Sequence, residues 1–293
     1  MKEGLALTNA ETIKAYLRER YRMSVVGIAD ASLMENEPAG RRPSDLLPGC
    51  KSIVVFGQRM IMGTAAMELR KFEGGVSAAS GSYHAYGIEQ APNLLLISAS
   101  YEFSNWTEKK FHTVAAALPC GGIGLQNCQP LDPTLPRVYG GIKQRLPFNT
   151  GKAAELAGLG QMGYHGFFIN PTFGPRIILG ALLTTLELDY DAPYAGETLC
   201  NPAVCKVCVE KCPTHAIPEF GTGKGISANR CMLASCGFKA GFGFRSSVKS
   251  DDPTDDEIRM AVKTVGREFP DHLQKSYCDL CAIYCPVGQQ NMK

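Results

Sequence analysis

The sequence predicts an α/β domain followed by a smaller, cysteine-rich domain, and two observations lead to that prediction. Segments with the composition of buried strands and segments with helical periodicity follow one another over the first two-thirds of the 293 residues. Nine of the 12 cysteines, by contrast, lie between Cys200 and Cys285. The composition changes near residue 190, so the predicted domains are 1–190 and 191–293.

The first part of the α/β domain is predicted from its caps and its aliphatic runs. Thr8 and Glu11 fit a capping box at the start of an N-terminal helix. β-branched residues predict buried strands over 23–29 and 51–57. The next element is a helix over 93–106, with Leu94, Leu95, Ile97, Ser98 and Tyr101 near one face.

The second part of the domain combines short strands with glycine-containing turns. A third strand is expected over 112–118, and a short helix runs into a glycine loop that ends at Gly163. Two further strands are expected on either side of PTFGP, residues 171–175, joined by that turn.

Charge and hydropathy limit the compartment and the partners. The net charge of +2 implies no strong field for nucleic acid or for a membrane surface. No apolar run approaches the roughly 18 residues that a bilayer-spanning helix needs, and the N-terminus has no signal-like apolar segment. We therefore expect a cytoplasmic protein, in which cysteines are reduced thiols or metal ligands.

The cysteines form an internal repeat. Cys205, Cys208 and Cys212, the last followed by Pro213, recur 73 residues later as Cys278, Cys281 and Cys285, followed by Pro286. This C-x2-C-x3-C-P spacing is typical of ferredoxins with two 4Fe–4S clusters, in which the cysteine before proline binds the other cluster. Structural zinc is the alternative, but zinc sites rarely add a third cysteine followed by proline.

Each cluster needs one more thiolate from upstream. Cys200 is available for the first motif, and either Cys231 or Cys236 for the second. We assign one cluster to Cys200, Cys205, Cys208 and Cys285, and the other to Cys212, Cys231, Cys278 and Cys281. The expected second domain is therefore ferredoxin-like.

A glycine motif lies at the end of the short helix. Gly158, Gly160 and Gly163 match G-x-G-x-x-G, which binds dinucleotides when it follows a strand and opens a helix. Here a helix precedes the motif and a strand follows it, so we expect instead a tight turn where the backbone approaches a cofactor. His165 lies in the same loop and is either a cofactor contact or a hydrogen-bonded core histidine.

Residues 151–191 and the cysteine repeat resemble the epoxyqueuosine reductase family, which shares a superfamily with corrinoid-dependent reductive dehalogenases. Ala157 to Gly160, Gly163, Gly180 and Leu183-Thr184 carry the resemblance, together with the ferredoxin cysteines. It implies a nitroreductase-like α/β domain that holds cobalamin, and clusters that deliver single electrons. Gly158, Gly160, Gly163 and His165 are then the expected cofactor contacts.

The chain departs from the family in two places. The family carries an Asp before a Tyr-His pair, whereas this chain has Ser82 before Tyr83-His84. Tyr83, His84 and Tyr86 are accordingly the candidate proton donors, although packed aromatic residues or a surface histidine explain them equally well. The chain also ends eight residues after Cys285, without the helical-repeat extension that suits tRNA binding in longer members.

The sequence thus predicts an oxidoreductase that passes electrons from two 4Fe–4S clusters to a site in the α/β domain. Ferredoxin or flavodoxin is the expected electron donor, and a small molecule or a corrinoid protein is expected as the substrate in preference to tRNA. The alternative is a ferredoxin-type electron carrier, or a reductive activator of a corrinoid protein, with no substrate of its own.

Overall fold

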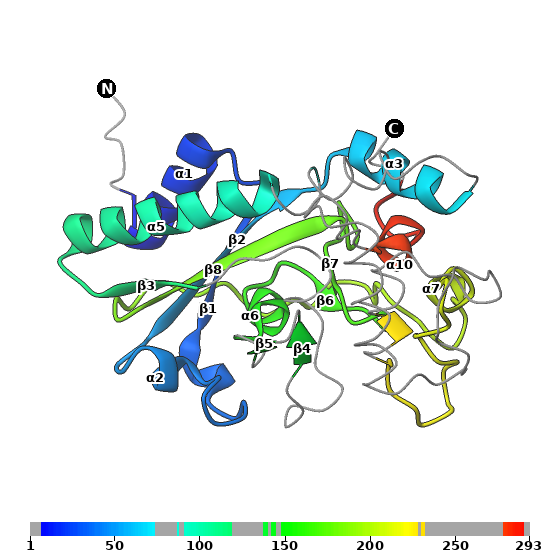
Figure 1. The fold of residues 1–293 in the computed structure, drawn as a ribbon. Coiled ribbons are helices and arrows are strands. Elements are labelled where there is room, and N and C mark those ends of the chain that lie inside the picture. The colour runs from blue at the N-terminus through cyan, green and yellow to red at the C-terminus, as the bar shows by residue number, and fades with distance from the viewer. Residues whose placement is uncertain are drawn as a thin grey trace.

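The computed structural model describes residues 7–73, 87, 91–118, 137–139, 142–144, 148–227, 230–231 and 278–289. Within these ranges the chain forms one four-stranded antiparallel sheet with helices on both faces (Figure 1). The predicted α/β class is confirmed in this general form. The division at residue 190 and the ferredoxin-like character of the second part stay predictions.

The central sheet has the strand order β1-β2-β8-β3. Its strands are β1 (Val25–Asp30), β2 (Ser52–Arg59), β3 (Ala115–Ala117) and β8 (Ile177–Thr184). β2 and β8 pair over their full length, from Ser52 opposite Thr184 to Arg59 opposite Ile177. The strands predicted from 23–29, 51–57 and 112–118 are therefore confirmed as β1, β2 and β3.

Alternating side chains of β2 and β8 build two cores. Val54 and Phe56 point to the face that is covered by α1 (Asn9–Tyr21) and α5 (Ala91–Phe111). Ile53 and Val55 point to the other face, which α6 (Thr150–Leu156) covers. Because both faces are covered, both strands read as continuous aliphatic runs and not as alternating ones.

The two long helices differ in how well the sequence predicts them. The capping box of α1 is present, since the main-chain N–H of Glu11 donates to Oγ1 of Thr8 and the Thr8 N–H donates to the Glu11 carboxylate. In α5 the buried side is formed by Leu96, Ala99 and Phe103. The face expected to be apolar is turned outward, and its large side chains are exposed: Leu94, Leu95, Ile97 and Tyr101.

The strands on either side of PTFGP exist but do not pair with each other. β7 (Phe168–Ile169) pairs with β6 (Gln161–Met162), whereas β8 joins the central sheet. Between them, Asn170 and Gly174 form an isolated bridge that closes the turn. This turn leads the chain from the glycine loop into the middle of the sheet.

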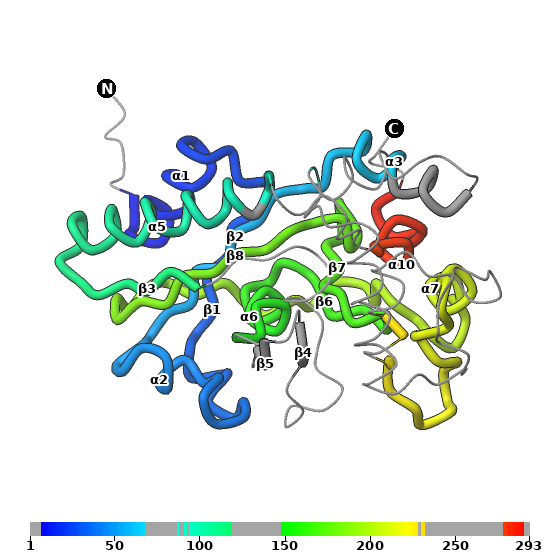
Figure 2. Tube along the Cα trace, in the orientation of Figure 1, coloured from blue at the N-terminus to red at the C-terminus, as the bar shows by residue number. Residues whose placement is uncertain are grey.

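The remaining described elements are short or peripheral. They are a 3-10 helix η1 (Ala31–Met34), α2 (Pro43–Leu46), α3 (Met62–Glu73), β4 (Arg137–Tyr139), β5 (Ile142–Gln144), α7 (Val207–Glu210) and α10 (Leu280–Ile283). α7 and α10 carry the two cysteine motifs, contact each other and lie at one end of the sheet (Figure 2). No helix in the described ranges is long and apolar enough to cross a membrane.

Candidate metal centre

Cysteines from two distant parts of the chain lie near one another, and their charges affect the ionisation of Cys208 and Cys285. Burial, and then the charges of Cys200, Cys205 and Cys285, raise the pKa of Cys208 to about 12. Burial also raises the pKa of Cys285, and Cys200 and Cys205 act on it in the same direction. Coulombic effects fall with distance, so these four thiols are neighbours. They are the four assigned to one cluster from the sequence.

The second group of cysteines surrounds a small apolar cluster. Cys212 is buried with Ala216 and Ile217, and Cys231 and Cys281 pack against them. Cys208, which was assigned to the first group, also belongs to this cluster, so the two groups adjoin. Cys278 is partly exposed at the start of the α10 segment. The division of the eight cysteines into two ligand sets stays a prediction.

Two of the sulfur atoms accept hydrogen bonds from the main chain. The N–H of Tyr164 donates to Sγ of Cys200 at 3.3 Å, and the N–H of Ala216 donates to Sγ of Cys212 at 3.1 Å. Such bonds favour the thiolate over the thiol and are one of the features that set the potential of an iron–sulfur cluster.

Arg176 ties the C-terminal cysteine motif to the sheet. Its side chain is 1% exposed, and Nη1 donates to the carbonyl oxygens of Ala282 at 2.9 Å and Cys285 at 2.8 Å. Nη2 donates to the carbonyl oxygen of Val287. Sequence reasoning missed this residue, because an arginine directly before a strand is usually exposed.

Two glycines allow the main-chain segments around these hydrogen bonds to lie directly against each other, because a glycine has no Cβ. Gly288 has φ +73°, and a Cβ there would lie 2.5 Å from the nitrogen of Gly174. Gly174 has φ +61°, and a Cβ there would lie 2.1 Å from the carbonyl oxygen of Val287. The turn before β8 and the loop after Cys285 are therefore in direct backbone contact.

The residues present fit an iron–sulfur group by their chemistry. They supply thiols, N–H donors to sulfur, an apolar surrounding and a buried cation. Thiolate ligands of this kind select iron–sulfur clusters or zinc over metals that prefer oxygen. No three His, Cys, Asp or Glu side chains of the described ranges converge as a site for a single metal ion.

Cys50 differs from these eight cysteines. Its thiol donates to the carbonyl oxygen of Ser52 at 3.6 Å and packs against the core below the sheet. Burial raises its pKa to about 11, so the thiol is neutral near pH 7. Cys50 is therefore explained as a small core residue.

The predicted glycine turn is filled by the chain's own atoms. A Cβ on Gly158, which has φ +73°, would lie 2.5 Å from the carbonyl oxygen of Ala192. At Gly160, with φ +151°, it would lie 2.0 Å from that of Ile169. At Gly163 it would meet the side chains of Ile169 and His165. Backbone packing accounts for all three glycines, and their contact with a cofactor stays a prediction.

His165 is a buried neutral histidine next to this turn. Burial, and secondarily the charge of Arg176, lowers its pKa to about 4. Nδ1 accepts the main-chain N–H of Phe167 at 3.1 Å, so the proton of the neutral ring is on Nε2. Nε2 is buried and has no hydrogen-bond partner within the described residues. Its proposed contact with a cofactor is not tested by this geometry.

The candidate proton donors Tyr83, His84 and Tyr86 lie outside the described residues, as do Ser82 and Cys236. The structure therefore places the predicted cluster ligands and the glycine turn, and it leaves the catalytic assignment as a prediction.

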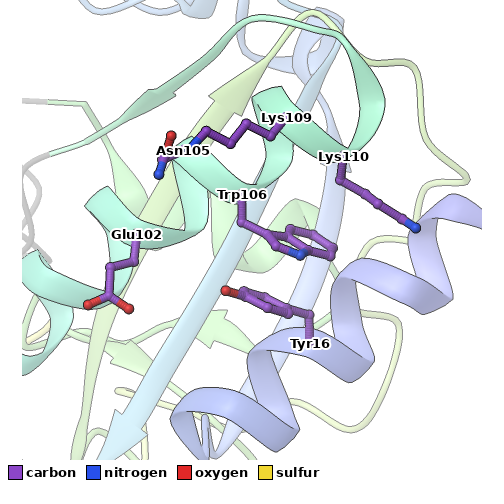
Figure 3. A pocket seen from close by; sticks show the side chains of 6 residues that line it. All are labelled: Tyr16, Glu102, Asn105, Trp106, Lys109 and Lys110. Carbon is purple, nitrogen blue, oxygen red and sulfur yellow. The ribbon is translucent and has the colours of Figure 1, made fainter.

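A separate open cavity of about 450 Å³ lies between α1 and α5, far from the cysteine motifs. Trp106 stacks on Tyr16 there, with ring centroids 3.9 Å apart and planes 9° from parallel (Figure 3). Glu102, Lys109 and Lys110 line its polar side. Tyr16 and Trp106 each cover one ring face of the other. The stacked pair is therefore explained as part of the contact between α1 and α5.

Comparison with known proteins relates the chain to two groups of reductases. No family model matches it. Epoxyqueuosine reductase of Synechococcus sp. (strain CC9605) is 31% identical over 139 residues, which are 47% of this chain and 35% of that protein. The Prochlorococcus marinus (strain NATL2A) enzyme of the same name is 42% identical over 139 residues, 47% of this chain and 36% of that protein.

A shorter match is to a protein of the second group, the reductive dehalogenases. Tetrachloroethene reductive dehalogenase of Dehalobacter restrictus (strain DSM 9455 / PER-K23) is 35% identical over 83 residues, 28% of this chain and 15% of that protein. The chain thus matches only about a third of the length of the two epoxyqueuosine reductases, and less of the dehalogenase.

Solved structures share the fold. A crystal structure of epoxyqueuosine reductase with an epoxyqueuosine-modified tRNA stem loop superposes with a TM-score of 0.53 at 17% identity, covering 97% of this chain and 67% of that one. The epoxyqueuosine reductase of Streptococcus thermophilus gives 0.52 at 17% identity, with 95% and 65% covered.

The chain is thus similar in sequence, over about half of its length, to epoxyqueuosine reductases, and over a shorter stretch to a reductive dehalogenase. The comparisons confirm that predicted resemblance. Both the sequence and the fold are similar to those of the epoxyqueuosine reductases.

This similarity corrects one prediction. The preference for a small-molecule substrate, with nucleic acid unlikely, is wrong, because the relatives that match about half of the chain or more are epoxyqueuosine reductases and one structural neighbour holds a tRNA stem loop. A net charge near zero is an average over the whole chain, whereas nucleic acid needs only a local basic surface. The position of the last residue says nothing about the substrate.

Proposed function

We propose that the chain is the iron–sulfur reductase part of an epoxyqueuosine reductase-type enzyme that acts on epoxyqueuosine in tRNA. The observation that carries the proposal is the contact between α7 and α10, which bring the duplicated cysteine motifs side by side at one end of the sheet although they lie more than 60 residues apart in sequence. The relatives that share the sequence are named for the same reaction.

The reaction sets the number of electrons and protons. Removal of the epoxide oxygen to leave a carbon–carbon double bond breaks two C–O bonds and releases water, and it consumes two electrons and two protons. Iron–sulfur clusters, when bound, supply electrons one at a time at low potential. An external ferredoxin or flavodoxin is the proposed source of both electrons.

The eight cysteines are the proposed ligands in the sets predicted from the sequence. Two observations support the first set. The charges of Cys200, Cys205 and Cys285 act on Cys208, and the main-chain N–H of Tyr164 donates to the sulfur of Cys200. The packing of Cys231 and Cys281 around Cys212 supports the second. This ligand assignment also proposes that the second part of the chain is ferredoxin-like.

Cobalamin is the proposed cofactor of the α/β part, on the strength of the family resemblance. The turn from Gly158 to Gly163 is occupied by Ala192, Ile169 and His165, so the turn itself adds no support for a macrocycle lying on it. We derive no step of the reaction through this cofactor.

Tyr83 is the proposed proton donor, because Ser82 stands where the family has an acid. A serine hydroxyl is a poor acid near neutral pH, whereas a phenol in a suitable environment can donate. His84 and Tyr86 are the neighbouring candidates. Replacing Tyr83 by Phe removes only the hydroxyl and should lower turnover at least tenfold with clusters intact.

The test uses anaerobically reconstituted protein, cobalamin, a chemical low-potential reductant and tRNA that carries epoxyqueuosine. Digestion and mass spectrometry of the nucleosides should show loss of one oxygen from the modified base. The paired variant Cys205→Ser should abolish conversion, whereas Cys50→Ser, outside both sets, should retain it. Protein that carries clusters and cobalamin but leaves the tRNA unchanged would contradict the proposed function and favour an electron carrier.

A further inference from the structure

The side chain of Arg176 is buried against the main chain of the second cysteine motif. It contacts the carbonyl oxygens of Ala282, Cys285 and Val287, which bracket the last cysteine of the repeat. Arg176 directly precedes β8, the strand at the centre of the sheet. A buried inner strand of the sheet therefore holds this guanidinium beside the main chain of Cys285.

The charge of this guanidinium has no carboxylate partner within the described residues. Its hydrogen bonds go to neutral carbonyl groups, and Nε has no hydrogen-bond acceptor there. Burying an arginine without an anion is costly, because carbonyl dipoles replace only part of the lost hydration. A thiolate at Cys285 would supply the missing negative charge.

We propose that Arg176 is a positioning residue for the cluster that includes Cys285, and that its buried charge raises the reduction potential of that cluster. The inference rests on the cluster ligands of the proposed function. Reduction adds one negative charge to the cluster, and a nearby cation in a medium of low dielectric constant favours the more negative state. The other cluster, which takes its thiolates from different positions, is affected less.

Two neighbouring positions allow charge to be separated from packing. Lys206 is exposed and follows Cys205, a ligand of the same proposed cluster, so its charge is screened by solvent. Gly288 contacts the turn before β8 directly and carries no charge. Lys206→Gln therefore removes a screened cation near the cluster, and Gly288→Ala disturbs the backbone contact while Arg176 keeps its charge.

The experiment is a redox titration of the reconstituted full chain, followed by EPR, with iron measured for each protein. In Arg176→Gln, the potential of one cluster should become more negative and that of the other should stay close to its wild-type value. Lys206→Gln should shift neither potential. Arg176→Lys keeps the positive charge but loses the planar arrangement of N–H donors. It should shift the potential of the same cluster less than Arg176→Gln does.

Full iron content with both potentials unchanged in Arg176→Gln would overturn the inference. An equal shift in Gly288→Ala would also overturn it, because the effect would then follow from packing and not from charge. If Arg176→Gln loses the cluster, Arg176→Lys decides: a potential at or slightly below the wild-type value supports the charge role, and a lost cluster or a large negative shift refutes it.

These outcomes are distinct from failure of the proposed function. Wild-type protein that binds no iron overturns both. Wild-type protein with two clusters and no activity on tRNA refutes only the proposed function, and the titration still tests Arg176.

Discussion

The main-chain nitrogen of Tyr164 lies 3.3 Å from the sulfur of Cys200, to which it donates its N–H. This hydrogen bond joins the segment after the glycine turn to the loop before the first cysteine motif. Asp191 lies between these two segments in the sequence. Its Oδ2 accepts the N–H of Ile28 in β1 at 2.8 Å, and its Oδ1 accepts a hydrogen bond from Nζ of Lys14 in α1 at 2.5 Å. These bonds hold the chain before Cys200 against β1. The sheet thereby sets where the first cysteines lie.

Cys200 should be a cluster ligand although its spacing from Cys205 is longer than usual. Cys200→Ser should lose or convert one cluster, so that iron falls from about eight atoms per chain to about four if the cluster is lost, or about seven if it is converted to a 3Fe–4S form. Cys50→Ser, whose sulfur bonds the carbonyl oxygen of Ser52, should keep all of it. Iron analysis and EPR after anaerobic reconstitution measure both variants. Full iron in Cys200→Ser would show that another residue completes the set.

Cys231, and not Cys236, should be the ligand between the two motifs. Cys231 packs against the apolar cluster that contains Cys212 and Ala216, where a ligand of the second cluster is needed. Cys231→Ser should therefore lose or convert one cluster, while Cys236→Ser should retain two. The opposite pattern of iron content would reverse the assignment.

Gly160 should be required for folding of the turn. Its φ of +151° is disfavoured for other residues, and a Cβ would lie 2.0 Å from the carbonyl oxygen of Ile169. Gly160→Ala should lower the free energy of unfolding by about 2 kcal/mol or more. Gly63→Ala in α3, where a Cβ meets nothing within 4 Å, should leave stability unchanged or raise it by up to about 1 kcal/mol. Denaturant titration compares the two, and equal stabilities would contradict this explanation.

His165 should make the protein less stable in mild acid. Its pKa is about 4 when folded, because of burial, against about 6.5 in an unfolded chain. Above pH 6.5 both states are neutral at this residue. As the pH falls from 6.5 to 4, only the unfolded state takes up the proton, so up to about 3 kcal/mol of stability is lost.

His165→Asn, which keeps an acceptor near the Phe167 N–H, should flatten this part of the pH dependence. His112→Asn, at an exposed histidine, should keep the wild-type slope. Denaturant midpoints measured between pH 4 and 7 give the comparison. The same slope in wild type and His165→Asn would mean that other groups control acid stability.

Local patterns determined much of what the sequence alone could predict. Thr8 and Glu11 identify the start of α1, because a capping box is formed by residues three positions apart. The aliphatic runs of β1 and β2 identify strands, since composition reports burial. The spacing of the cysteine motifs predicts the chemistry of the site, because each motif supplies two thiolates to one cluster and the cysteine before proline to the other.

The tertiary structure decided which distant segments meet. β7 and β8 are neighbours in sequence but belong to different sheets, because β8 gains more by pairing with β2 over eight residues than by closing a hairpin. The outward face of α5 is another example, since both of its sides carry apolar residues and only packing against α1 and the sheet selects Leu96, Ala99 and Phe103. Arg176 reaches Cys285 across 109 residues of sequence. Local spacing contains no information on such a contact, because it depends on where the sheet places each chain segment.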